Sequence, residues 1–356
     1  MILFSPGPSN ISERVRQSLL HADIGHREVE FGALLSEIRR DIRRVVGLRD
    51  NAPHEIVLLG GSGSVAIESM IAACRPLGKV LVIANGPYGE RAAAMGRHHG
   101  VDVDEWRLGW GEAIALDALA ARMGAILYGA VYLVHHETAT GRLNPLRDVA
   151  AMAKARGALV LSDTISSIVG EPIDIEAWQL DGVIGSANKC LRGVPGAAFV
   201  VASPALRGAA ELQRGAHYSN LATHATAEDA GEFPFTPPLH AMLALREALR
   251  ETLDEGVAAR QAHYAALMAR LLDGLEALGI RLLLPRDAYG RTLVACHLPD
   301  GWSYEALHAP LKRAGLCIYA AQGALKGRAF RLGIIGHFGI DAIDALLREM
   351  RVVLGR

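Results

Sequence analysis

Short apolar runs alternate with helical patterns between residues 55 and 202. The apolar runs lie at residues 55–59, 79–83, 129–134, 158–161 and 180–185. Strands buried in a parallel sheet have this continuous apolar character, because helices cover both faces of such a sheet. The alternation of strands and helices therefore predicts an α/β fold whose sheet is mostly parallel.

The pattern changes in the second half of the chain. Residues 209–235 are polar and irregular, which predicts a loop, and two helical patterns then run to about residues 254 and 278. Beyond them we expect strands near residues 281–284, 292–297, 316–319 and 328–335, with helices near 304–314 and 340–354. This mixture predicts a smaller C-terminal α+β domain at residues 256–356, following a large domain at residues 1–255.

Composition narrows the class of protein. A chain of 356 residues that is 51% hydrophobic has ample material for two cores. Its net charge of −1 gives no reason to expect nucleic acid or an anionic membrane as partner. The N-terminus lacks the basic start of a signal peptide, and the apolar runs are too short to span a bilayer. The four cysteines are far apart and show no metal-ligand spacing. We therefore expect a reduced, cytoplasmic protein without a metal.

A glycine-rich turn follows the strand at residues 55–59. Gly60-Gly61-Ser62-Gly63-Ser64 leads directly into a helical pattern, so unpaired backbone N–H groups would face a ligand there. The helix dipole favours an anion at this position, and we expect Ser62 and Ser64 to assist in binding a phosphate. The turn also fits the loose dinucleotide fingerprint, but the next strand ends in Ala84-Asn85 without the acidic residue that would hold a ribose. A glycine N-cap without ligand is the simpler alternative.

Lys189 stands out among only five lysines in the chain. It follows the apolar run 180–185, and small residues surround it in Ser186-Ala187-Asn188-Lys189-Cys190. A lysine at the end of a buried strand is partly desolvated, which lowers its pKa and suits it to Schiff-base formation or general base catalysis. A lysine whose ammonium merely reaches water is the alternative.

Asp163 ends the neighbouring apolar run. A carboxylate at the end of a buried strand requires a cationic partner, and a protonated pyridine nitrogen would be one. A turn or N-cap aspartate is the alternative. Because parallel strands present their carboxyl ends at one edge of a sheet, Asp163, Lys189 and the glycine-rich turn should share a crevice. Together they predict a site for pyridoxal 5′-phosphate.

Three further positions carry candidate chemistry. Tyr88 follows the strand at residues 79–83 and could stack on a planar ligand, or it could be a turn tyrosine. Adjacent residues of a strand point to opposite faces, which argues against one metal ion bound by both His135 and His136. Arg331 lies inside an apolar strand, where its guanidinium requires a carboxylate or phosphate of a ligand, or else a structural salt bridge.

Motifs along nearly the whole chain are similar to those of one family. The most specific is Ser186-Ala187-Asn188-Lys189-Cys190 with Gly193-Val194-Pro195-Gly196. The others are Ser5-Pro6-Gly7-Pro8, the glycine-rich turn, Asn85-Gly86-Pro87-Tyr88-Gly89, Glu137-Thr138-Ala139-Thr140-Gly141, Asp163, Phe235-Thr236-Pro237-Pro238 and Phe330-Arg331-Leu332-Gly333. The chain thus resembles class V pyridoxal-phosphate aminotransferases of fold type I, which implies a large domain of seven-stranded type.

The resemblance implies a role for each matching residue. Lys189 corresponds to the lysine that binds the cofactor, with Asn188 beside it, and Asp163 to the partner of the pyridinium nitrogen. The phosphate contacts correspond to Ser62, Gly63 and Ser64 and, from a second subunit, Thr236. Tyr88 takes the position that stacks on the ring, Thr138 supplies a hydroxyl near the ring oxygen, and Arg331 holds the substrate carboxylate. Gly7, in an N-terminal segment (residues 1–15) that reaches the active site, corresponds to a substrate contact. The implied assembly is a homodimer with shared active sites.

The resemblance also implies a reaction. It is strongest with the branch of the family that converts 2-aminoethylphosphonate and pyruvate into phosphonoacetaldehyde and L-alanine. Residues 213–232 do not look like that branch, so an alanine–glyoxylate or serine–pyruvate type of reaction is the nearest alternative. A desulfurase would need a reactive cysteine, whereas Cys317 lies in an apolar run and is expected in the core. A binding protein without activity is a further alternative, since fold does not imply function.

Overall fold

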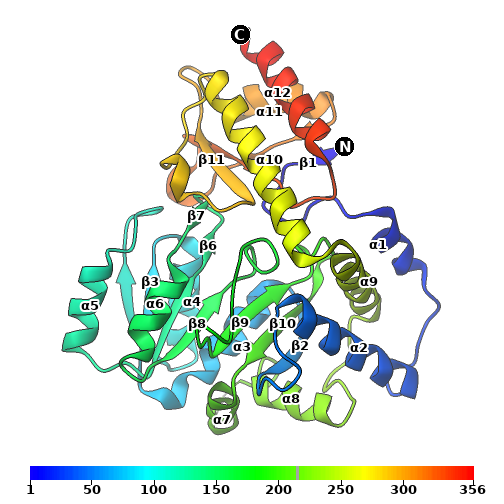
Figure 1. Cartoon of the computed structure of the whole chain (residues 1–356), viewed down its shortest axis with the longest axis vertical. Coiled ribbons are helices and arrows are strands. Elements are labelled where there is room, and N and C mark those ends of the chain that lie inside the picture. The colour runs from blue at the N-terminus through cyan, green and yellow to red at the C-terminus, as the bar shows by residue number, and fades with distance from the viewer. Residues whose placement is uncertain (214–215) are drawn as a thin grey trace.

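A seven-stranded sheet forms the centre of the larger part of the molecule in the computed structural model, which describes residues 1–213 and 216–356 (Figure 1). The strand order is β2–β10–β9–β8–β5–β3–β4. Among the described strands of this sheet, β10 pairs antiparallel with β2 and β9 and all other pairs are parallel, so the prediction of a mostly parallel sheet is confirmed. The strands are β2 (Glu55–Gly61), β3 (Lys79–Ala84), β4 (Asp102–Arg107), β5 (Ala130–Val134), β8 (Leu159–Asp163), β9 (Gly182–Ser186) and β10 (Gly196–Ala202).

Helices cover both faces of this sheet and form two apolar cores with it. Because successive residues of a strand point to opposite faces, Phe199 of β10 lies in one core and Val200 in the other. The first core includes α2 (Val29–Val45), α5 (Leu116–Ala125), α6 (Leu146–Lys154) and α9 (Leu239–Glu255). The second includes α3 (Gly63–Ala73), α4 (Pro87–His98), α7 (Pro204–Leu212) and α8 (Leu221–Asp229).

A smaller sheet with its own core follows α9. Its antiparallel strands have the order β11–β14–β13, which are Leu293–His297, Ala329–Gly333 and Tyr319–Ala320. Three helices pack around it: α10 (Val257–Ala277), α11 (Tyr304–Arg313) and α12 (Ile340–Leu354). The start of the chain also lies here, as Figure 1 shows. Its β1 (Ile2–Leu3) pairs with β12 (Leu316–Cys317).

The remaining elements are short. They are α1 (Glu13–Gln17), the hairpin strands β6 (His136–Glu137) and β7 (Arg142–Leu143), and the 3-10 turns η1 (Ser18–Leu20), η2 (Arg75–Leu77), η3 (Arg286–Ala288) and η4 (Gly323–Leu325). Within residues 1–213 and 216–356, no helix combines the length and the apolar character needed to cross a membrane.

Three sequence-based expectations are wrong. Residues 281–284 form no strand, because their pairing is limited to a single bridge between Leu282 and Cys296. The run at 316–319 divides between β12 and β13, which belong to different sheets. The expected loop at 209–235 contains the end of α7 and all of α8, since Leu221 and Ala225 of α8 pack into the second core. Residues 214–215 of this segment lie outside the described residues.

Candidate active site

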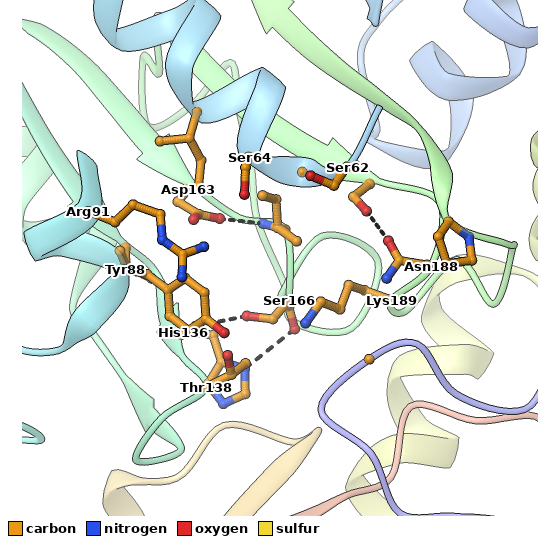
Figure 2. Close-up of a pocket in the computed structure, with 17 residues that line it drawn as sticks. Ser62, Ser64, Tyr88, Arg91, His136, Thr138, Asp163, Ser166, Asn188 and Lys189 are labelled. Carbon is orange, nitrogen blue, oxygen red and sulfur yellow. Dashed lines mark hydrogen bonds between the residues drawn. The ribbon is translucent and has the colours of Figure 1, made fainter. Parts of the chain in front are cut away.

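A cavity of about 180 Å³ lies at the carboxyl ends of the parallel strands (Figure 2). It is lined by nine of the eleven residues named from the sequence: Gly7, Ser62, Gly63, Ser64, Tyr88, Thr138, Asp163, Asn188 and Lys189. The two that do not line it are Thr236 and Arg331. Residues from six separate segments therefore meet at this one edge of the sheet.

The start of α3 forms the wall of the cavity that follows β2. Ser62 is the N-cap residue, and its side chain makes no capping hydrogen bond. The N–H groups of Gly63 and Ser64 donate to no other residue in the described part of the chain. A Cβ atom on Gly63 would lie 2.6 Å from Cδ1 of Ile165, so a side chain at this position would displace Ile165. Free N–H groups at a helix start, with two serine hydroxyls beside them, suit a phosphate group.

Asp163 lies at the end of β8, where it is only 5% exposed. Its Oδ1 accepts a hydrogen bond from the N–H of Ile165 at 2.9 Å. Burial raises the pKa of Asp163 to about 6, although the charges of Lys189 and Arg91 act in the opposite direction. No lysine or arginine among the described residues forms an ion pair with it. A buried carboxylate without a cation fits a ligand that carries a protonated ring nitrogen.

Lys189 follows β9, the strand that pairs with β8. Its Nζ donates a hydrogen bond to the carbonyl oxygen of Pro6 at 2.5 Å. Removal of the amine from water lowers the pKa of Lys189, which favours the neutral, nucleophilic form. The turn that follows is closed by Gly193, whose N–H donates to the carbonyl oxygen of Ala187 at 2.7 Å. Beside the lysine, the side chain of Asn188 accepts a hydrogen bond from the hydroxyl of Ser186.

Tyr88 lies in the first turn of α4, and its side chain is half-buried in the cavity wall. The guanidinium carbon of Arg91 lies 5.0 Å from the centre of the tyrosine ring. Arg91 also lines the cavity, as Figure 2 shows, and the sequence-based reasoning missed it. The spacing was the available signal, because residues three positions apart share one face of a helix.

Arg331 lies behind the cavity in the middle strand of the smaller sheet. It is 6% exposed, and its Nη1 donates to the carbonyl oxygen of Thr138 at 3.1 Å. Its Nε and Nη2 donate to the carbonyl oxygen of Ala320 at 3.1 and 2.9 Å. Arg331 makes no ion pair within residues 1–213 and 216–356, so the structural salt bridge considered from the sequence is not found there. The guanidinium donates to neutral carbonyl groups, so its positive charge is available to an anionic ligand.

Thr236 is exposed on the surface just before α9. Because it does not line the cavity, this chain alone does not bring it to Lys189 and Asp163. The sequence-based reasoning had assigned Thr236 to the site of a second subunit.

His135 and His136, which follow β5, are both buried. Nδ1 of His135 lies 3.0 Å from the hydroxyl of Ser167, and Nδ1 of His136 lies 3.2 Å from the hydroxyl of Thr292. Burial lowers their pKa values to about 3 for His135 and about 4 for His136. The described residues contain no cluster of three metal-ligating side chains.

The expectation that Cys317 lies in the core is wrong. It is partly exposed, and its Sγ lies 3.7 Å from Nε2 of His308. It is absent from the lining of the cavity that contains Lys189.

The fold and this cavity define a class of enzyme. The start of α3 has free N–H groups, and a buried carboxylate and a partly desolvated lysine follow the adjoining parallel strands β8 and β9. This arrangement fits pyridoxal 5′-phosphate in a fold-type I enzyme. The sequence profile of class-V aminotransferases matches residues 3–326, so the chain belongs to that family. The aminotransferases of this class depend on pyridoxal 5′-phosphate, and relatives of this chain at 34–35% identity are named transaminases. This chain is therefore a pyridoxal-phosphate-dependent aminotransferase.

Individual relatives are similar over almost their full length. A 2-aminoethylphosphonate–pyruvate transaminase of Burkholderia thailandensis is 35% identical over 368 residues, which cover 99% of this chain and 98% of the relative. The protein of the same name from Pseudomonas putida is 34% identical over 367 residues with the same coverage. Among solved structures, an alanine–glyoxylate aminotransferase from Nostoc sp. has a TM-score of 0.91 and 29% identity, covering 99% of this chain and 95% of that one.

Proposed function

We propose that this enzyme transfers the amino group of 2-aminoethylphosphonate to pyruvate, forming phosphonoacetaldehyde and L-alanine. The observation that carries the proposal is the similarity, at 34–35% identity over 99% of the chain, to transaminases named for these two substrates. The cavity supports it, because Arg331 is a buried cation that carries no ion-pair partner in the described residues and lies beside Thr138 at the cavity wall.

Each residue of the cavity has a place in this reaction. Ser62, Gly63 and Ser64 would hold the cofactor phosphate, and Asp163 would keep the ring nitrogen protonated. Tyr88 would stack on the ring, while Thr138 and Asn188 would contact its substituents. When bound, pyridoxal 5′-phosphate supplies an electron sink for the electrons left on the substrate carbon.

Lys189 is the proposed catalytic group. It would hold the cofactor covalently until the amino group of the donor displaces it. Its freed amine would then move a proton from the donor carbon to the C4′ carbon of the cofactor, acting first as base and then as acid. Partial desolvation supports this role, because it favours the neutral amine that accepts a proton.

Arg331 would bind the carboxylate of pyruvate through the two edges of its guanidinium. The backbone at Gly7, which lies against the side chain of Lys189, would contact the substrate on the opposite side. An anion in this position neutralises a buried charge that otherwise has only carbonyl partners.

We further propose that the active enzyme is a homodimer in which Thr236 contacts the cofactor phosphate of the partner subunit. Its exposure and its absence from the lining of the cavity of its own chain support this arrangement. We keep the division into domains at residues 1–255 and 256–356, supported by the separate apolar core around α10 and the smaller sheet. A cytoplasmic location is proposed because the four cysteines are unpaired.

The visible spectrum tests the donor directly. Protein loaded with pyridoxal 5′-phosphate should show the absorption band of the lysine-bound cofactor, and 2-aminoethylphosphonate alone should convert it to the amine form. If the band is unchanged by 2-aminoethylphosphonate but disappears when alanine or serine is added, the phosphonate assignment is wrong. Absence of any band, with Lys189 intact, would contradict the role given to the cavity.

A second candidate is an alanine–glyoxylate or serine–pyruvate type of reaction. The similarity in fold and sequence to the alanine–glyoxylate aminotransferase of Nostoc sp. favours it. Initial rates with 2-aminoethylphosphonate, alanine and serine, each with pyruvate and with glyoxylate, distinguish the two candidates. The proposed reaction requires that the phosphonate and pyruvate give the largest kcat/KM.

A further inference from the structure

Glu137 is a fully buried carboxylate directly behind two walls of the cavity. It is 0% exposed and ends the short strand β6, one residue before Thr138. Its Oε1 accepts a hydrogen bond from the N–H of Ala139 at 3.0 Å, and its Oε2 accepts one from the N–H of Tyr88 at 3.4 Å. One side chain therefore joins the loop that carries Thr138 to the helix that carries Tyr88.

The contact with Tyr88 provides the N-cap that α4 lacks in its own sequence. The N-cap residue is Gly86, which has no side chain to accept a hydrogen bond from the first turn. A Cβ atom on Gly86 would lie 2.4 Å from Oε2 of Glu137, so the carboxylate occupies the space of that side chain. Because the φ angle of Gly86 is 177°, space rather than backbone conformation explains the glycine. A carboxylate at this end of the helix is also favoured by the dipole.

The opposite side of Glu137 leads to Arg331. The N–H groups of Thr140 and Gly141 donate to the carbonyl oxygen of Glu137 at 3.2 and 2.7 Å, which closes a tight turn around Thr138. The carbonyl oxygen of Thr138 in turn accepts the hydrogen bond from Nη1 of Arg331. The orientation of the guanidinium thus depends on a turn whose first residue is Glu137.

We propose that Glu137 is a positioning residue that orients Tyr88 against the cofactor and Thr138 against Arg331. It touches neither substrate nor cofactor and acts through these neighbours. The inference rests on the roles proposed above for Tyr88 and Arg331. No lysine or arginine in the described part of the chain forms an ion pair with Glu137, so its carboxylate is committed to the two backbone N–H groups.

The test compares Glu137→Ala with Glu137→Gln, which keeps the shape and one acceptor oxygen. In cofactor-free protein, Glu137→Ala should increase hydrogen exchange at the amide of Tyr88 about tenfold, because that N–H loses its partner. After loading, the dissociation constant for pyridoxal 5′-phosphate should rise about tenfold and the visible circular dichroism of the cofactor should change. KM for the 2-oxo acid should rise more than kcat falls. Glu137→Gln should restore all four properties to within about threefold of the wild type.

Asp181 offers a matched control at the opposite edge of the sheet. It is also a buried carboxylate, and its Oδ2 accepts a hydrogen bond from the N–H of Val160 at 2.7 Å. Asp181 also pairs with Lys154, so Asp181→Ala, which removes the carboxylate as Glu137→Ala does, should lower thermal stability without changing the cofactor signal or KM. A purely structural role of Glu137 would give this same result for Glu137→Ala and would overturn the proposal.

Gly86→Ala provides a second variant in case Glu137→Ala fails to fold. Its added methyl group would displace the carboxylate without removing it, so the circular dichroism and the cofactor affinity should change as in Glu137→Ala. Tyr88→Ala distinguishes the positioning role of Glu137 from the cofactor contact of Tyr88. If Tyr88→Ala changes these signals while Glu137→Ala and Gly86→Ala do not, the positioning role is wrong and the role of Tyr88 stands. If Tyr88→Ala also leaves them unchanged, both are overturned.

Discussion

Lys189 and Pro6 lie 183 positions apart in the chain, yet the Nζ of Lys189 donates a hydrogen bond to the carbonyl oxygen of Pro6 at 2.5 Å. The start of the chain is held there by the C-terminal part of the molecule. Ile2 pairs with Leu316, and the N–H of Gly333 donates to the carbonyl oxygen of Phe4 at 2.9 Å. The environment of the lysine therefore depends on contacts with both the large sheet and the smaller one.

Gly7 is the position where this arrangement is most sensitive to substitution. A Cβ atom there would lie 2.6 Å from Cδ of Lys189, and the φ angle of +121° is unfavourable for other residues. We expect Gly7→Ala to weaken cofactor retention and lower kcat/KM at least about tenfold, since strain of ~1–3 kcal/mol adds to displacement of the lysine. The visible absorption of dialysed protein and steady-state kinetics measure both effects.

Gly47→Ala is the control for backbone strain. Gly47 has a φ angle of +77°, but no atom lies within 4 Å of its Cβ position. This variant should lose stability and keep its cofactor. Equal cofactor retention in Gly7→Ala and Gly47→Ala would show that contact with Lys189 is unimportant.

Asp163 should be essential for the chemistry more than for binding. Asparagine has nearly the same shape but cannot keep a ring nitrogen protonated by its charge, so the electron sink is weakened. We expect Asp163→Asn to slow the donor half-reaction at least about 100-fold, a loss of the size found for proton-transfer groups. Stopped-flow spectra with 2-aminoethylphosphonate measure this rate. A decrease of less than about threefold in loaded Asp163→Asn would refute the pairing with the ring nitrogen.

The elements that carry Asp163 and Lys189 could be recognised because their signals are local. An apolar run that ends in a charged residue is visible within ten positions, and β8 and β9 do pair as neighbours. The residues that were missed depend on contacts between distant segments. Arg91 becomes a cavity residue only when α4 packs against β3 and β5, and the polar sequence of α8 conceals a helix that the second core stabilises. Conversely, the apolar residues at 281–284 found no full partner strand.

Glu228 should make the stability of the cofactor-free protein depend on pH. Burial raises its pKa to about 8, although Arg39 lies 3.5 Å away and acts in the opposite direction. The folded protein then holds a proton that the unfolded chain releases above a pKa of 4.5. The contribution of Glu228 to the free energy of unfolding is complete below pH 4.5. It is lost as the pH rises through about 8, at up to ~1.4 kcal/mol per pH unit.

Urea unfolding at about pH 5 and about pH 8 tests this dependence. Glu228→Gln should reduce this loss of stability. The free energy of unfolding of the variant should therefore rise relative to that of the wild type as the pH rises. The exposed Glu211, replaced by glutamine, serves as control and should leave the pH dependence unchanged. An equal pH dependence in Glu228→Gln and the wild type would contradict the raised pKa.

Arg331→Lys tests whether the forked guanidinium, and not charge alone, binds the acceptor. Lysine cannot donate to Thr138, Ala320 and a carboxylate in the same plane. We expect KM for pyruvate to rise about 10- to 100-fold with a smaller change in kcat, as for a lost hydrogen bond to a charged group. Arg328→Lys, three positions earlier and exposed, should behave like the wild type. Equal effects on KM and kcat would contradict a role confined to binding.

Thr236 provides the test of shared active sites. If Thr236 serves the cavity of the partner subunit, Thr236→Ala and Lys189→Ala damage different halves of one site. Homodimers of Lys189→Ala should be inactive, and those of Thr236→Ala should bind the cofactor about tenfold more weakly, the expected cost of one phosphate contact. A mixed dimer of the two variants should contain one site with an intact Lys189 and an intact Thr236. Differently tagged subunits, refolded together and purified for both tags, should therefore regain one site of wild-type affinity per dimer. Only weak binding in the mixed dimer would place Thr236 in the site of its own chain. Wild-type affinity in the Thr236→Ala homodimer would place Thr236 outside the site altogether.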